Sequence, residues 1–524
     1  MRLKHHFSVA HVLAGTAALA LLACHGDSNV KSPPASPVLA RPVSLLFVDA
    51  ATNQPITASL QAVARDANGQ LSTVTRDRSG GAASTFSATG GALTFQVDPS
   101  TTQALSFIVV ATVDGYNSTS VHCDLPANAG YQETARMVRI GAPPVGVATV
   151  QAPVGTTDAT GATAATIAIS TPPEPNSLGT STLSVPQQTK ITAVDGTPLT
   201  GELVATLSYF NNQDSSSLAA FPGGLDVTVP STPTSASAAS GSFVSGGFTA
   251  IELKDGSGNQ AKNFSQPVAV KIDIAPGTVN PDTGAALKAG DVIPFWSYDE
   301  TTGQWKSEGT VTVQSNGSGG LQAVGNVIHL SYWNLDWFRN QDLCQSHAAT
   351  IAISGNSQKL PLRLEVRASG YYHETTATDS TIVLANPVVG VWATITASYN
   401  GNVVGSAGPI QNLCGATVNL NVNVPVVTPA SLTVHVKRVC NEDHSKTTPV
   451  PSVGVYLYSS NGVQPGQFTD ASGNTTFSGL SAGEALTAAS ENHDAKVTLG
   501  SGSNSVDVSI PWTCALTGAA GGSP

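Results

Sequence analysis

The sequence predicts an all-β protein built from tandem antiparallel β-sandwich modules. Only 11% of its 524 residues are charged, whereas about 25% are charged in an ordinary soluble domain. Gly, Ser, Thr, Ala, Val and Pro are abundant instead, a composition typical of β-branched strands joined by tight turns. Beyond the N-terminal apolar stretch no apolar period of 3.6 residues is sustained, so long amphipathic helices are not expected.

The first 23 residues have the layout of a secretory signal peptide. Basic Arg2 and Lys4 precede a largely apolar stretch from Phe7 to Ala23, the order that marks an exported protein. The stretch ends Leu21-Leu22-Ala23-Cys24, which resembles the bacterial lipobox. In lipoproteins of that type the cysteine thiol receives a diacylglyceryl group, the chain is cut before the cysteine, and the new amine is acylated. The resemblance therefore predicts lipidation at Cys24, with an incidental cysteine after a plain signal peptide as the alternative.

The lipid anchor implies a membrane location. Several acyl chains hold a protein stably, because each buried CH₂ contributes about 0.8 kcal/mol. His25 rather than Asp follows Cys24, which by resemblance to enterobacterial sorting indicates an outer-membrane lipoprotein. No later apolar run approaches the roughly 18 residues of a membrane span. Residues 24–41, with three prolines near their middle, are expected to form a flexible lipidated tether.

The remaining sequence divides into four modules, a linker and a tail. We expect module one at 42–140, a Pro/Ala/Thr-rich linker at 141–176, module two at 177–340, module three at 341–427, module four at 428–516 and a tail at 517–524. The linker is assigned from its composition and from Pro172, Pro173 and Pro175, which interrupt strand patterns. The alternative for its Val147–Ala152 portion is a strand that closes module one or opens module two.

Module one opens with a strand at 43–48, an Asp/Asn turn at 49–56 that contains Pro55, and a second strand at 58–63. The pattern predicts a hairpin. A later alternating strand, 105–113, ends in Asp114-Gly115-Tyr116. These features resemble the carboxypeptidase-regulatory-like and related bacterial Ig-like modules, which implies a β-sandwich.

Module two contains two motif-rich segments, Trp296-Ser297-Tyr298-Asp299 through Trp305-Lys306-Ser307-Glu308-Gly309, and then His329-Leu330-Ser331-Tyr332-Trp333-Asn334-Leu335-Asp336. Together they resemble a module of cartilage intermediate layer protein and related extracellular proteins. The sequence departs from that pattern at Leu330, where an aromatic residue is usual.

Modules three and four show weaker signals. Gly370-Tyr371-Tyr372 in module three is similar to Gly115-Tyr116 in module one, which suggests a weak internal repeat. In module four, residues 469–480 read as a strand, an Asp-x-x-Gly turn and a strand. This run again resembles the carboxypeptidase-regulatory-like hairpin.

The cysteines predict two disulfides. An exported chain enters an oxidising compartment, where pairing is the default. The intervals from Cys344 to Cys414 and from Cys440 to Cys514 are each about one sandwich domain long. We therefore predict Cys344–Cys414 and Cys440–Cys514, with loop entropies worth about 4 kcal/mol each as an upper figure. Cys123 remains and is expected to be a buried apolar residue.

Metal sites are weakly indicated. Cys344 precedes His347 and Cys440 precedes His444, but neither pair has a second matching pair nearby, so no zinc is expected. Three turn aspartates offer calcium ligands, although such residues more often form Asx turns: Asp195, Asp255 and Asp299.

Two patterns could carry catalysis. Residues 479–483 fit G-x-S-x-G, but that motif needs a following helix, and 485–489 read as a strand. His329-Leu330-Ser331 resembles the self-cleavage site of related modules, including the autoproteolysis-inducing domain of adhesion receptors. The resemblance implies that His329 acts as base while Ser331 attacks the Leu330 carbonyl. The alternative is that both residues lie on one strand face and support the core.

Four of the six tryptophans lie close together in the sequence. They could form an aromatic platform for sugars, but core positions are more usual for residues that bury so much area. These residues are Trp296, Trp305, Trp333 and Trp337.

The charge and the motifs exclude several functions. The net charge of −11 is small for this length and no Lys/Arg stripe occurs, so nucleic acid is not an expected partner. No H-E-x-x-H or phosphate-binding G-x-x-x-x-G-K-[ST] motif occurs, so no cofactor and no metal are expected.

The leading functional hypothesis is a non-catalytic adhesion, scaffolding or ligand-binding lipoprotein of the cell envelope, which binds a protein or glycan through loops or strand edges. The alternatives are a protein that cleaves itself at Leu330/Ser331 and a carbohydrate-binding accessory lipoprotein.

Overall fold

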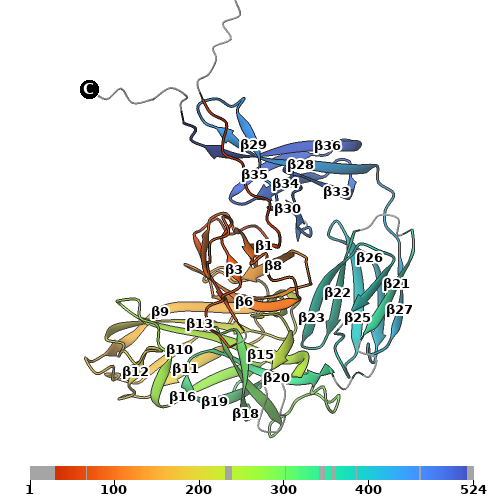
Figure 1. The fold of residues 1–524 in the computed structure, drawn as a ribbon. Coiled ribbons are helices and arrows are strands. Elements are labelled where there is room, and N and C mark those ends of the chain that lie inside the picture. The colour runs from red at the N-terminus through yellow and green to blue at the C-terminus, as the bar shows by residue number, and fades with distance from the viewer. Residues whose placement is uncertain are drawn as a thin grey trace, which may run out of the picture.

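The computed structural model describes residues 30–515 except 67, 230–238, 301, 342–343, 345–347, 357–360, 385 and 460–461. The signal peptide, Cys24, His347 and the tail lie outside the described residues. Strands dominate, and the described residues contain a single α-helix, α1, at Ser215–Leu218. The prediction of an all-β chain of antiparallel sandwiches is confirmed (Figure 1).

Module one is a sandwich of two four-stranded sheets, β3-β5-β1-β8 and β4-β2-β6-β7. Its apolar residues alternate into the space between the sheets, as in Leu60, Ala62 and Ala64 of β2. The strands are β1 (Pro42–Asp49), β2 (Leu60–Arg65), β3 (Thr75–Arg76), β4 (Thr85–Ala88), β5 (Ala92–Val97), β6 (Leu105–Val113), β7 (Thr119–Leu125) and β8 (Tyr131–Met137).

Modules three and four repeat this topology. Module three pairs the sheets β24-β21-β27 and β23-β22-β25-β26, and module four pairs one sheet around β28 with another around β30 and β34. In module three the strands are β21 (Ala349–Gly355), β22 (Leu362–Ala368), β23 (Tyr371–Ala377), β24 (Thr381–Leu384), β25 (Ala393–Tyr399), β26 (Asn402–Ile410) and β27 (Thr417–Val422). In module four they are β28 (Pro429–Cys440), β29 (Thr447–Pro449), β30 (Gly454–Ser459), β31 (Gly462–Val463), β32 (Gln467–Phe468), β33 (Asn474–Ser481), β34 (Ala485–Ser490), β35 (His493–Thr498) and β36 (Gly502–Trp512).

In all three modules the first strand pairs in parallel with the last: β1 with β8, β21 with β27 and β28 with β36. The second strand lies in the opposite sheet. The hairpin predicted between 43–48 and 58–63 is therefore wrong as a strand pairing, because β2 lies in the other sheet. Across the turn at 49–56 only the isolated antiparallel bridge Val48–Pro55 forms before the chain passes to that sheet. The Asp turn itself is present, since Asp49 Oδ1 accepts the Ala51 and Thr52 N–H groups. The similar hairpin in module four is wrong for the same reason, as β32 pairs with β30 and β33 with β28.

Modules one and three do share a topology, but their Gly-Tyr pairs do not occupy equivalent positions in it. Gly115 and Tyr116 follow β6, whereas Gly370 and Tyr371 follow β22, which is equivalent to β2. The turn equivalent to Gly115 is Asn400-Gly401 after β25, where both residues have positive φ (48° and 76°).

Module two is larger, and its strands follow the order β10-β11-β16-β19-β18-β17-β20-β15-β13-β9. The long β18 pairs with β17 at one end and β19 at the other, which joins the two faces of the sandwich. Its strands are β9 (Val147–Thr157), β10 (Ile167–Ser170), β11 (Ser181–Val185), β12 (Ile191–Thr192), β13 (Gly201–Phe210), β14 (Asp226–Val229), β15 (Ala239–Asp255), β16 (Asn263–Ile274), β17 (Val292–Asp299), β18 (Gln304–Ser315), β19 (Leu321–His329) and β20 (Tyr332–Asn340).

The linker expected at 141–176 is therefore wrong. β9 pairs along its length with β13, and β10 pairs with β11. Val147 and Ile167 are buried in the core of module two. The small residues of this segment build strands, so module two begins near residue 147.

The modules gather around module one, which lies in the middle of the molecule (Figure 1). Module two meets it where the Tyr332 hydroxyl donates to the Ser118 carbonyl at 2.6 Å. Module four meets it where Tyr456, fully buried, packs against Leu46 and Val48 and donates to Ser44 Oγ at 2.9 Å. Figure 1 thus shows a closed cluster of modules, with module three beside modules one and two.

Residues 30–41, expected to be a flexible tether, lie against module four. Val30 and Leu39 are buried, and the Leu39 N–H donates to Ser452 Oγ at 3.1 Å. Proline carbonyls remain good acceptors, and Thr448 Oγ1 donates to the Pro33 carbonyl at 2.6 Å. For the described part of the tether, the flexible interpretation is wrong.

Candidate functional site

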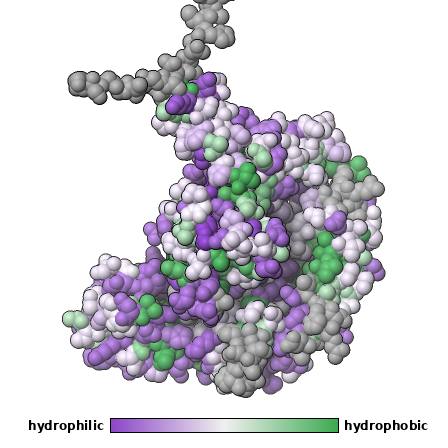
Figure 2. Space-filling view, in the orientation of Figure 1, coloured by the Kyte–Doolittle hydropathy of each residue, from purple (hydrophilic) through white to green (hydrophobic). Residues whose placement is uncertain are grey.

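A cleft of about 770 Å³ opens where modules one, three and four meet. Its walls are β8 of module one, β23 and the β25–β26 turn of module three, and the segments 463–466 and 483–486 of module four. Figure 2 shows a recess at this junction, with mainly hydrophilic and intermediate colours around it. The site exists only because the three modules assemble.

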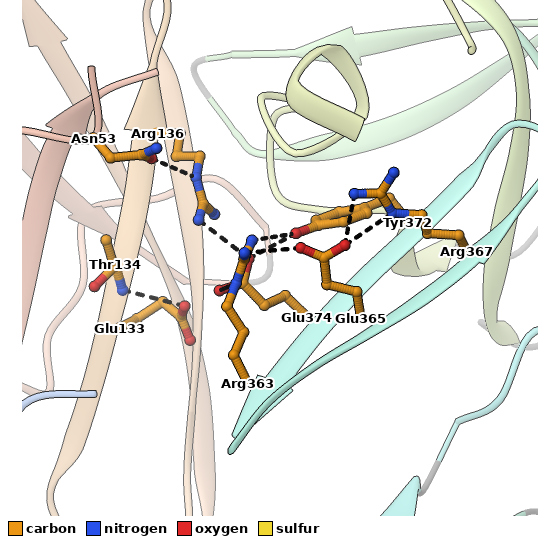
Figure 3. Close-up of polar contacts among 9 residues, drawn as sticks. All are labelled: Asn53, Glu133, Thr134, Arg136, Arg363, Glu365, Arg367, Tyr372 and Glu374. Atoms are coloured by element: carbon orange, nitrogen blue, oxygen red, sulfur yellow. Dashed lines mark hydrogen bonds and ion pairs between the residues drawn. The ribbon is translucent and has the colours of Figure 1, made fainter. Parts of the chain in front are cut away.

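An ionic network joins modules one and three along one wall of the cleft (Figure 3). Glu374 of β23 accepts hydrogen bonds from Arg136 Nη2 of module one at 3.1 Å and from Arg363 Nη2 at 2.9 Å. The Tyr372 hydroxyl donates to the same carboxylate at 2.7 Å. Burial raises the pKa of Glu374, but the hydrogen bonds and positive charges outweigh it and lower the pKa to about 2. Glu374 is therefore ionised at physiological pH and holds the two modules together.

Glu365 extends the network within module three. It receives Arg363 Nη1 at 2.8 Å and Arg367 Nη2 at 2.6 Å. Both guanidinium groups near the cleft, those of Arg136 and Arg363, are thus engaged by carboxylates. The network gives the cleft wall rigidity and leaves little free positive charge for an anionic ligand.

Glu133 and Gln132 supply polar groups to the cleft. The Glu133 carboxylate accepts hydrogen bonds from the Thr134 N–H at 3.2 Å and the Tyr131 hydroxyl at 3.4 Å, but it has no ion-pair partner within 4.0 Å among the described residues. Protein surrounds it on the remaining sides, and this burial raises the pKa of its carboxyl. Gln132 Nε2 is buried and lacks a hydrogen-bond partner within the described chain. A ligand with hydroxyl or amide groups could accept from Gln132 Nε2 and donate to the remaining lone pairs of Glu133.

The predicted pair His329 and Ser331 does come together, and with a third residue. Ser331 Oγ lies 3.5 Å from His329 Nδ1, and His329 Nε2 lies 3.2 Å from Glu308 Oε1. Glu308 also accepts from Ser297 Oγ at 2.9 Å. Burial raises the pKa of Glu308, but hydrogen bonds from His329, Lys306 and Ser297 lower it to about 2. A proton on Nε2 directed at Glu308 leaves Nδ1 as an acceptor facing the serine.

No left-handed residue and no cis peptide bond occurs at the Leu330–Ser331 position. Leu330 and Ser331 connect β19 to β20, where the chain crosses from one face of module two to the other. Neither residue has positive φ, and both are buried, Ser331 with 2% of its surface exposed. The ring of His329 packs beside Trp333 at 4.9 Å. The burial of Leu330 and Ser331 and the His329–Trp333 contact fit the packed end of a strand, while the Ser331–His329 contact also fits a reactive serine.

The tryptophan cluster lies in the core, as the alternative interpretation predicted. The indole of Trp305 stacks on Phe221 at 5.1 Å and meets Phe243 edge-on at 4.9 Å. Exposure is 7% or less for each of the four residues, Trp296, Trp305, Trp333 and Trp337. No sugar platform is built from them.

The turn aspartates are occupied by their own turns or by a lysine. Asp255 Oδ1 accepts the Ser257 and Asn259 N–H groups, and Asp195 Oδ1 accepts that of Thr197. Asp299 pairs with Lys262 at 3.5 Å. Within the described ranges one group of possible metal ligands occurs, Cys440, Glu442 and Cys514, and its two cysteines are joined to each other.

The cysteine arrangement agrees with the sequence. The structure contains the disulfides Cys344–Cys414 and Cys440–Cys514. Cys123 is free and fully buried, and burial raises the pKa of its thiol. Ser481 of the G-x-S-x-G run ends β33 and is followed by β34, so no nucleophile elbow forms there. Its hydroxyl instead meets Tyr399 of module three at 2.7 Å.

The chain matches no family model and no curated protein. Among solved structures, it is similar to the minor pilin GBS52 of Streptococcus agalactiae, at 14% identity over 32% of this chain and 97% of that one, with a TM-score of 0.15. It is also similar to the major pilin RrgB of Streptococcus pneumoniae, at 8% identity over 90% and 99% of the two chains, with a TM-score of 0.15. The corresponding values for the major pilin SpaD of Corynebacterium diphtheriae are 8%, 91%, 97% and 0.14. Scores this low carry no information on function.

Among the described residues, no helix is long and apolar enough to cross a bilayer.

Proposed function

We propose that this chain is a non-catalytic lipoprotein of the cell envelope, anchored at Cys24, which binds a polar ligand in the cleft between modules one, three and four. The observation that carries the proposal is the cleft itself, about 770 Å³ in volume and lined by three modules. Clefts of this size at domain junctions are common ligand sites. The signal-peptide layout and the lipobox-like end support the envelope location and the outer membrane as its destination.

The chemistry of the cleft favours an uncharged or positively charged ligand rich in hydroxyl or amide groups. Glu133 has no ion-pair partner within the described chain, whereas Arg136 and Arg363 are already engaged. Glycans and polar peptide segments both meet these requirements.

A blocking substitution tests the proposal. Thr376 lines the cleft from β23, and Thr376→Trp should fill part of the space and weaken binding at least tenfold on glycan and peptide arrays. The matched control is Thr381→Trp on β24, an exposed position in the other sheet of module three, which should bind like the unaltered protein. Equal binding by both variants would exclude the cleft as the ligand-binding site. Binding to only one of the two arrays would decide between a glycan and a protein ligand.

A second candidate function is self-cleavage at Leu330/Ser331, favoured by the hydrogen-bond relay from Glu308 through His329 to Ser331. In that reaction Ser331 Oγ would attack the Leu330 carbonyl carbon while His329 takes the hydroxyl proton. As the Leu330–Ser331 C–N bond breaks, His329 would pass that proton to the Ser331 nitrogen, which becomes a free amine, and Leu330 would be left as an ester on Ser331 Oγ. Water would then hydrolyse this ester.

We expect the mature protein to run as one intact band on a denaturing gel, because neither Leu330 nor Ser331 has positive φ or a cis peptide bond and the serine is buried. Self-cleavage of a peptide bond is helped by backbone strain at that bond. Two fragments meeting at Leu330/Ser331, absent from Ser331→Ala, would instead establish self-cleavage.

A further inference from the structure

The segment 30–41, which we name the strap, connects the far end of module four to module one. Its first residues lie at the far end of module four: Val30 packs against the Cys440–Cys514 disulfide beside Trp512, and the Lys31 N–H donates to the Ala515 carbonyl at 3.1 Å. The beginning of the strap is thus fixed next to the last described residue of the chain.

The middle of the strap follows the surface of module four. Thr448 Oγ1 donates to the Pro33 carbonyl at 2.6 Å and Arg438 Nη1 to the Pro34 carbonyl at 3.2 Å. The partners are more than 400 positions apart in the sequence. These contacts hold the strap along module four before it reaches module one.

The strap ends in a firm attachment to module one. The buried Arg41 guanidinium donates to four backbone carbonyls, among them Pro126 at 2.7 Å and Gln103 at 3.0 Å. Because both halves are bonded, the strap is a brace between modules four and one, and its start has a defined position on the molecule.

That position lies at one pole of the structure. In Figure 1 the strap starts beside β36 and β29 at the top of the view, and module two occupies the opposite end. Six peptide units separate Cys24 from Val30, and even a fully extended chain of that length spans only about 20 Å. A lipid on Cys24 must therefore keep the disulfide end of module four within about that distance of the bilayer.

The side chains at this pole suit a lipid surface. Arg438 stacks over the Trp512 ring at 4.5 Å, and Lys31 is exposed beside them. Trp, Arg and Lys are the residues that favour the membrane–water interface. The neighbouring Glu442 is engaged by the Cys514 N–H at 2.8 Å.

We propose that the strap makes module four the membrane-proximal module and directs module two away from the bilayer. The inference rests on the lipid anchor proposed above. It reverses the order that a linear string of modules would give, in which module one would stand next to the membrane and module four farthest from it.

Fluorescence energy transfer to vesicles tests the orientation. Two exposed turn serines are replaced by cysteine for labelling, Ser445 in module four and Ser318 in module two. The native cysteines of the described chain are paired or buried. On vesicles of phosphatidylethanolamine and phosphatidylglycerol with an acceptor-labelled headgroup, transfer from Ser445→Cys should exceed that from Ser318→Cys several-fold. Equal transfer, or more from Ser318→Cys, would overturn the proposal.

Two arms separate failure of the anchor from failure of the orientation. In the first, the mature protein is used with its natural N-terminus, and its mass shows whether Cys24 carries acyl groups. In the second, Cys24 is replaced by a histidine tag that binds nickel-chelating lipids. Absence of acyl groups would contradict the proposed lipid anchor. The tagged protein would still show whether the strap sets the orientation.

Releasing the strap provides the control within the molecule. Val30→Asp with Leu39→Ser places polar groups at two buried apolar positions of the strap and should reduce the difference in transfer between the two labels in the tagged arm. Val38→Asp changes a strap residue that is 65% exposed and should leave the difference unchanged. An unchanged difference in the double variant would show that the strap does not set the orientation.

Discussion

Replacing Gly370 by alanine is expected to detach module three from module two. Gly370 has φ of +72°, and an added Cβ would lie 2.2 Å from the Ser245 carbonyl oxygen and 2.9 Å from its nitrogen. Both neighbours are backbone atoms, so no side chain can move aside. The Gly370 carbonyl also accepts the Ser245 N–H at 2.8 Å. Alanine would therefore force the two modules apart at this backbone contact.

The expected loss is about 2–3 kcal/mol. A left-handed conformation costs an alanine about 1–2 kcal/mol, and the broken hydrogen bond adds about 1 kcal/mol. Calorimetry should show an earlier, separate transition for module three, and small-angle scattering should show a larger radius of gyration.

Gly390→Ala is the matched control for this prediction. Gly390 belongs to the same module and has nearly the same φ, +73°, but the nearest atom to its Cβ is an arginine nitrogen at 4.0 Å. It therefore carries the conformational cost without the collision. If both variants unfold alike and remain equally compact, the Gly370–Ser245 contact does not hold the modules together.

Gly370 matters because it leads into β23, which touches two other modules. Tyr371 and His373 reach Asp226 of module two at 3.0 and 2.8 Å, while Glu374 reaches Arg136 of module one at 3.1 Å. Alternate residues of one strand point to opposite faces, so a single edge strand can join modules one, two and three. In the sequence, the signal for this strand is Gly370-Tyr371-Tyr372, which by its similarity to Gly115-Tyr116 suggests an internal repeat and not a contact between modules.

Local patterns predicted the strands, whereas long-range pairing had no local signal. The alternation in 43–48 marks a strand, but nothing in it indicates that β1 pairs in parallel with β8 at the far end of the module. The small residues of 141–176 suggested a linker, with a strand at 147–152 as the alternative, because composition alone does not reveal the ten-residue pairing partner, β13. The prolines of the strap suggested flexibility because their hydrogen-bond donors lie in module four.

The candidate sites divide in the same way. His329 and Ser331 could be predicted as a pair because they are two residues apart. Glu308 belongs to the motif at 296–309, but its contact with His329 could not be predicted from the sequence. The cleft could not be predicted, since Arg136 and Glu374 are 238 positions apart and each lies in an ordinary strand. Only the packing of three modules brings these residues together.

Asp336 provides the second large effect, which depends on pH. It is fully buried in module two, and neither carboxylate oxygen meets a hydrogen-bond partner of good geometry within the described chain. Burial raises its pKa to about 8, although the neighbouring Ser245 and Asn334 act in the opposite direction. An unfolded aspartate has a pKa of about 3.9. The folded protein therefore holds a proton on Asp336 throughout the range between these two values.

Asp336→Asn should therefore stabilise the protein, and more so at high pH. Because the folded state binds more protons, the free energy of unfolding of the unaltered protein falls as pH rises from about 4 to about 8 and is constant above that. Each pH unit in this window costs about 1.4 kcal/mol, whereas an amide has no proton to lose. The advantage of the variant should grow from near zero at pH 4 to about 3–6 kcal/mol at pH 8. Urea unfolding followed by tryptophan fluorescence measures this difference in stability, because four of the six tryptophans lie in the core of module two, the module that contains Asp336.

Asp195→Asn, at an exposed turn of the same module, should bring no such gain, because its carboxylate is stabilised in the ionised form by the Thr197 N–H at 2.9 Å. A variant Asp336→Asn that is less stable than the unaltered protein at pH 8 would show that the buried carboxylate is ionised and has a positive partner. Since replacing a buried acid by its amide removes only the charge and not the packing, a gain that grows with pH can come only from the proton that module two keeps in its core.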